Sequence, residues 1–96
     1  MISREDFIFA IGFDGDQAVV DGRAKREFGR LSTSQLAEAG QWRAAFASAL
    51  WSGKDDEIEE FRSLYNRASG SEYRTVEELK RLFGVQKDAI GKALVL

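Results

Sequence analysis

A run of apolar residues from Gln35 to Trp51 constrains the fold of this chain more than any other feature of its sequence. Between Trp42 and Trp51 only Arg43 and Ser48 are polar. A helix that is apolar on nearly every side is a buried helix, because a surface helix keeps a polar face toward water. We therefore predict a single buried helix over residues 35–51, with the other elements packed around it.

Residues that start and stop helices divide the remaining chain into short segments. Ser3, Ser32 and Thr75 each stand where a capping side chain is expected, and Gln35 and Glu78 complete two capping boxes. Glycines follow the predicted segments, and the chain has no proline. The prediction is an all-α or mainly α fold, a single domain over residues 1–96 with five to six short helices. Besides 35–51, the predicted helical segments are 4–11, 17–28 (capped by Asp16), a helix capped by Asp55 or Asp56 and ended by Gly70, 76–83 and the tail 85–96.

The N-terminal part of the chain also fits a β-hairpin over about residues 7–21. In this alternative, FIFAI and QAVVD are strands joined by GFDGD, and the fold class becomes α+β. Phe, Ile and Val favour strands, and periodicity does not separate the two readings over so short an apolar run. A hairpin on its own is only marginally stable, so the helical reading is preferred.

The residue types in the chain exclude several kinds of chemistry. There is no cysteine and no histidine, so disulfides, the usual zinc sites and histidine-dependent nucleophilic catalysis are excluded. Asp14, Asp16 and Asp21 do not fit a calcium loop, because its fifth position would be Ala18 and no glutamate falls at its twelfth. The five acids in 55–60 are typical of a helix start, where the helix dipole favours negative charge. We therefore expect no enzyme, no cofactor and no bound metal.

With these kinds of chemistry excluded, the function that remains is binding to another macromolecule; the sequence does not identify the biological role. We expect a small non-enzymatic protein-interaction or regulatory module that binds a protein partner or a second copy of itself through apolar helix faces. In a domain of this size with five or six helices, not every apolar face can be covered. The expected contact residues are Trp51, Leu94 and Leu96.

A second hypothesis is a nucleic-acid-binding domain that uses the basic stretch 23–30. Its expected phosphate contacts are Arg23, Lys25, Arg26 and Arg30, with Arg43 nearby. The segment that follows resembles a helix-turn-helix only faintly, because its second half is apolar and has few side chains that could read bases. A continuous buried helix explains that segment better.

The sequence also gives an expectation about location. The apolar part of the N-terminus is only five residues, Phe7 to Ile11, and acidic residues flank it, unlike a signal peptide. No apolar run approaches the roughly 18 residues that a membrane-spanning helix needs. We therefore expect a cytoplasmic protein without a membrane partner.

Overall fold

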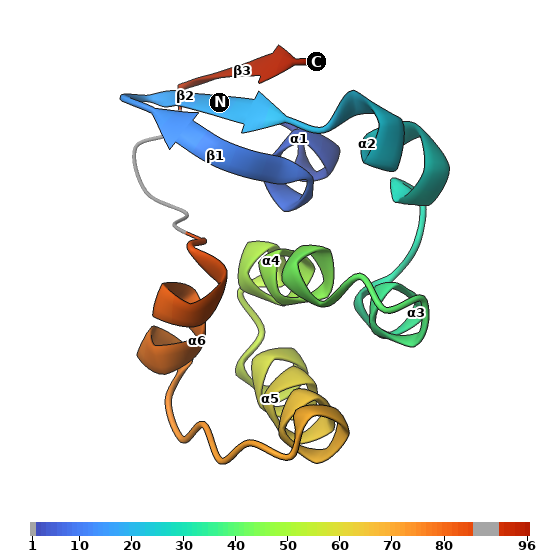
Figure 1. Cartoon of the computed structure of the whole chain (residues 1–96), viewed down its shortest axis with the longest axis vertical. Coiled ribbons are helices and arrows are strands. Elements are labelled where there is room, and N and C mark those ends of the chain that lie inside the picture. Colours follow the sequence, from blue (N-terminus) through green and yellow to red (C-terminus); the bar gives the residue numbers. More distant parts are fainter. Residues whose placement is uncertain (1, 86–90) are drawn as a thin grey trace.

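The computed structural model of the protein describes residues 2–85 and 91–96. Within these ranges the chain is rich in helix and carries a small three-stranded sheet at one end (Figure 1). One hydrophobic cluster takes side chains from both the sheet and the helices. The elements in chain order are α1 (Arg4–Ile8), β1 (Ala10–Asp14), β2 (Gln17–Val20), α2 (Gly22–Phe28), α3 (Thr33–Glu38), α4 (Trp42–Ser52), α5 (Asp55–Ser69), α6 (Val76–Phe83) and β3 (Lys92–Val95).

The sheet corrects the all-α prediction for the N-terminal part of the chain. β1 and β2 form an antiparallel hairpin, as the α+β alternative had it, and β3 adds parallel to β2 to give the order β1-β2-β3. The turn between the hairpin strands is two residues long and places Gly15 at a φ of 61°, which glycine adopts without strain. The hairpin is not isolated, because α1 packs against both β2 and α4 and covers one sheet face (Figure 1).

Two helices predicted in this region are therefore shorter than expected. The first ends at Ile8, and the second begins at Gly22 behind an Asp21 cap, not at Gln17 behind Asp16. The expected C-terminal helix is replaced by β3 within the described residues, and positions 86–90 lie outside them. β1 and β2 pair with each other across a two-residue turn, and β3 pairs with the distant β2; in each case strand pairing outweighs the local helical spacing.

The predicted continuous helix over 35–51 is wrong, because the chain breaks it at Gly40. α3 ends there in a Schellman motif: the N–H of Gly40 donates to Ala37 and the N–H of Gln41 donates to Leu36. Gly40 has a φ of 75°, which fits the left-handed residue of this motif. The capping box of Ser32 and Gln35 is confirmed at the start of α3.

α4 carries most of the apolar run, and its residues 44–50 are all buried. It contacts α1, α3, α5 and α6. Phe46 stacks against Phe83 of α6 and lies 5.5 Å, centroid to centroid, from Phe61 of α5. Offset and edge-on ring pairs of this kind add to the stabilisation that burial gives. The helices are thus held together by an aromatic cluster on one side of α4.

The remaining helix ends agree closely with those predicted from the sequence. Gly53, Gly70 and Gly84 end α4, α5 and α6 in the left-handed conformation, as predicted. The capping box of Thr75 and Glu78 is confirmed at the start of α6. The cap of α5 differs slightly, because Lys54 occupies that position and Asp55 is already the first helical residue.

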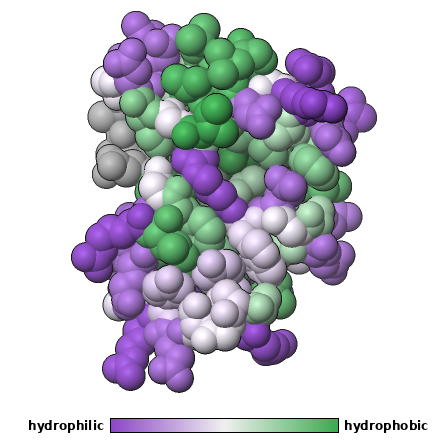
Figure 2. Space-filling view, in the orientation of Figure 1, coloured by the Kyte–Doolittle hydropathy of each residue, from purple (hydrophilic) through white to green (hydrophobic). Residues whose placement is uncertain are grey.

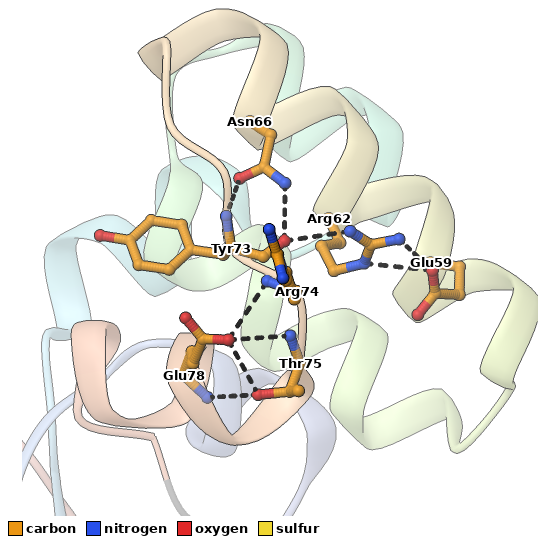
Figure 3. Close-up of polar contacts among 7 residues, drawn as sticks. All are labelled: Glu59, Arg62, Asn66, Tyr73, Arg74, Thr75 and Glu78. Atoms are coloured by element: carbon orange, nitrogen blue, oxygen red, sulfur yellow. Dashed lines mark hydrogen bonds and ion pairs between the residues drawn. The ribbon is translucent and has the colours of Figure 1, made fainter.

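A polar network fixes the loop between α5 and α6 (Figure 3). The side chain of Asn66 binds the backbone of Tyr73 twice: its amide donates to the carbonyl (2.8 Å), and its oxygen accepts from the N–H (3.0 Å). Arg62 donates to the same carbonyl and pairs with Glu59 at 2.6 Å. The hydrogen bond from Arg62 lowers the pKa of the Glu59 carboxyl. The network satisfies a loop backbone that has no regular secondary structure of its own.

We predict that Asn66→Ala lowers the free energy of unfolding by about 1–3 kcal/mol, because it leaves a partly buried backbone group without a partner. Asn66→Asp keeps the acceptor for the Tyr73 N–H but sets a carboxylate oxygen against the Tyr73 carbonyl, so it should also be less stable than the control. Ser63→Ala, at an exposed position of the same helix, is the control. Denaturant unfolding measures all three, and an Asn66→Ala variant as stable as the control would contradict the role given to this network.

Candidate functional site

The outer strand of the sheet carries the main group of exposed apolar side chains. β3 lies at the edge, and no strand in the described part of the chain pairs with its outer side. Leu94 is 48% exposed, Val95 45% and the adjacent Leu96 67%. Figure 2 shows the resulting hydrophobic patch at the end of the molecule where β3 lies. Contiguous apolar surface of this kind marks an interaction site more often than scattered single residues do.

The register of β3 decides which way its side chains point. Ala93 and Val95 are paired with Ala18 and Val20, which are fully buried, so these residues share the sheet face that packs on the core. Leu94 is paired with Val19 and therefore lies on the opposite, outer face. Exposed apolar groups consequently occur on both faces of the same edge strand.

The hydrogen bonds of β3 alternate between its two sides. The N–H of Lys92 donates to Asp16 (3.3 Å), and the N–H of Leu96 donates to Val20 (3.0 Å). In a parallel ladder every second residue directs its backbone groups to the same neighbouring strand, so the backbone N–H and C=O groups of Leu94 also point toward β2. The N–H and C=O groups of Ala93 and Val95 then point to the free edge, where they can bind another strand.

A glycine holds the end of this strand against α2. A β-carbon at Gly22 would collide with the backbone oxygen of Leu96 and would lie 3.0 Å from a methyl group of Val95. In the sequence Gly22 is a weak point within a predicted helix. In the structure it is the first residue of α2, at a place where only glycine lets the strand approach.

Trp51, the third residue predicted for this surface, is placed elsewhere. Its ring lies 5.4 Å from that of the buried Phe7, centroid to centroid, and packs against the hydrophobic core at half-burial. We leave it out of the surface for this reason. Val95, which the sequence did not single out, belongs to the surface because a strand exposes alternate residues to both faces.

The basic residues predicted to contact phosphate are divided by the structure into two groups. Lys25 forms an ion pair with Asp6 at 2.6 Å. Arg43 donates to the carbonyls of Phe83 and Gly84 at the end of α6. Burial lowers the pKa of the Arg43 guanidinium, and these two hydrogen bonds hold it at the end of α6.

The other three arginines remain on the surface. Arg23, Arg26 and Arg30 are exposed, and their side chains make no hydrogen bond or ion pair with any residue in the described ranges. They recur at i, i+3 and i+7, which places them along one side of α2 and its C-terminal extension. Arg26 and Arg30 line an open hollow together with Arg4, which is held by Ser48 and by the carbonyls of Gly29 and Leu31.

A turn does separate α3 from α4, as in a helix-turn-helix, but the second helix is buried. Residues 44–50 of α4 are covered by protein and offer no base-reading side chains. α4 therefore cannot serve as a recognition helix.

Residues 2–85 and 91–96 form neither a metal-binding cluster of acidic side chains nor a helix that could cross a membrane. No group of three or more Asp or Glu side chains comes together there in an arrangement that could hold a metal ion. None of the helices in those ranges has the length and apolar character needed to cross a membrane. The chain matches no protein-family model, no curated protein and no solved structure.

We predict that Gly22→Ala destabilises the protein, although the same change usually stabilises a compatible helical site by about 0.4–1 kcal/mol. The added methyl group displaces the end of β3, so the amide protons of Leu94 and Leu96 should exchange with solvent faster than in the parent protein. Gly12→Ala is the control, since a β-carbon there meets open space. A Gly22→Ala protein with a raised melting temperature and unchanged exchange would show that the close approach is unimportant.

Proposed function

We propose that the protein is a non-enzymatic interaction module that associates with itself through the exposed edge of its sheet. The observation that carries this proposal is the placement of β3 at a free edge with three exposed apolar residues, Leu94, Val95 and Leu96. The strand offers both unpaired backbone groups and apolar side chains, the two components of β-strand addition.

The composition of the edge supports the proposal. Proteins usually prevent an edge strand from pairing with another strand. They do so by placing charged residues, proline or a bulge in the edge strand, or by covering it with another element. From Ala93 to Leu96 there is neither a charged side chain nor a proline, and Lys92 is the single charged residue of β3. The opposite edge is different, because β1 has a bulge between Ala10 and Gly12 and ends at Asp14. Of the two edges, the one formed by β3 is suited to pairing.

We predict that the protein associates as its concentration rises from micromolar to millimolar and that Leu94→Glu weakens this association about tenfold or more, a change of about 1.4 kcal/mol or greater. The new carboxylate would have to lose water at the contact. Light scattering coupled to size exclusion measures the mass. Leu82→Glu on α6 is the matched control, since Leu82 is 43% exposed and lies outside the sheet. Constant monomeric mass over the whole range would remove the proposal.

A second candidate function, binding to nucleic-acid phosphates, is favoured by one observation. Arg23, Arg26 and Arg30 form an exposed line without acidic partners in the described part of the chain. Arginines that are not paired within the protein can neutralise phosphates at little cost. Lys25 and Arg43 are no longer part of this candidate site because both are bound within the fold.

For this second function we predict sequence-independent binding to a labelled DNA duplex at low salt, measured by fluorescence anisotropy. Arg26→Ala/Arg30→Ala should weaken binding equally on all sequences and flatten the plot of log K against log salt by about 0.9 per lost phosphate contact. Arg67→Ala/Arg74→Ala removes the same charge from exposed sites on α5 and the following loop and is the control. Equal affinities for the two variants would contradict a site on α2.

A further inference from the structure

We infer that two copies of the chain pair their β3 strands antiparallel about a two-fold axis at Leu94, which joins their sheets into one of six strands. The inference rests on the proposed self-association. It adds that the free edge of β3 is covered by the β3 strand of a second copy, that the two strands run antiparallel, and which residues face each other. It follows from the backbone polarity of the edge and from the positions of its apolar side chains.

The backbone polarity selects the register. Only Ala93 and Val95 of β3 direct their N–H and C=O groups outward, because Lys92 and Leu96 donate toward β2. When Ala93 of one copy faces Val95 of the other, both outward residues of both copies are used and four hydrogen bonds form. Centring the pair on Ala93 sets Val95 opposite Gly91, whose N–H already donates to Asp16, and centring it on Val95 pairs only one outward residue of β3 in each copy. The two-fold axis therefore passes beside Leu94.

The side chains on the outer face agree with this register. The two Leu94 residues stand directly opposite each other and do not hydrogen-bond to each other. Opposed residues of this kind have the shorter of the two α-carbon separations found in an antiparallel pair. Val19 lies beside Leu94 on β2, so an apolar strip runs across the axis from one copy to the other. Cross-strand pairs of large apolar residues are the contacts that stabilise a sheet.

Pairing in this register also covers an exposed apolar side chain on the core-facing side of β3. Val95 is 45% exposed although its partner on β2, Val20, is fully buried. In the proposed register, Ala93 of the second copy stands opposite Val95 and covers part of it. An isologous contact of this type uses the same patch twice and closes on itself, so it yields a dimer and not a filament.

The absence of cysteine from the sequence makes the register directly testable. In an antiparallel pair without mutual hydrogen bonds the α-carbons are about 4.5 Å apart, within the 4.4–6.8 Å range of disulfides. Leu94→Cys should therefore form a disulfide-linked dimer under mild oxidation, about tenfold or more faster than Lys92→Cys or Leu96→Cys alone, because pairing raises the local thiol concentration.

Lys92→Cys and Leu96→Cys are the matched controls. In the proposed register, two copies of residue 92 are about 13 Å apart along the strands, too far for a disulfide. Residue 92 of one copy stands opposite residue 96 of the other, so a mixture of the two variants should form the heterodimeric disulfide. Non-reducing electrophoresis and mass spectrometry of the cross-linked product measure each yield.

The outcomes separate this inference from the proposed function. A protein whose mass rises with concentration, but in which Leu94→Cys cross-links no faster than the controls, overturns the antiparallel register and leaves self-association standing. Rapid cross-linking of all three single variants would indicate a parallel, in-register pair and would overturn it as well. A mass that stays monomeric, with cross-linking at the slow rate of random collision for every variant, rejects both.

Discussion

The close approach of neighbouring elements to α4 is the constraint on which the rest of the structure depends. Four of its seven residues between 44 and 50 are alanines, all buried, and α1, α3, α5 and α6 each contact the helix. Alanine itself contributes little apolar area, so most of the stabilisation comes from large buried side chains, including Phe46 of α4 itself, Leu36 of α3 and Phe61 of α5. Because α1 packs on both α4 and β2, the same contact also positions the sheet and its exposed edge.

The helix caps could be read from the sequence, whereas the break at Gly40 and the pairing of the strands could not. The capping boxes at Ser32 and Thr75 are local, and both were correctly predicted. The break at Gly40 was missed because one glycine costs a helix only about 1 kcal/mol, which local reasoning treats as tolerable. β3 was missed because its spacing fits a helix equally well until β2 supplies a partner.

The same division applies to the candidate site. Leu94 and Leu96 could be proposed from the sequence because a domain of this size with five or six helices cannot cover every apolar face. The positions of Trp51 and Arg43 could not, since each is decided by a contact across the fold, with Phe7 in one case and with the end of α6 in the other. The charges in the sequence likewise did not show that Lys25 and Arg26 differ in their pairing. In the structure Lys25 forms an ion pair with Asp6 of α1, and Arg26 has no such partner in the described part of the chain.

The parallel pairing of β2 with β3 has a consequence for the order of folding. Gln17 pairs with Lys92, and the helices α2 to α6 all lie between the two strands in the sequence. Closing so long a loop is entropically costly unless the intervening helices have already brought its ends together. The hairpin can therefore form early, while the third strand joins late. The edge proposed for dimerisation would exist only in molecules whose helices are already packed, which would restrict pairing to folded copies.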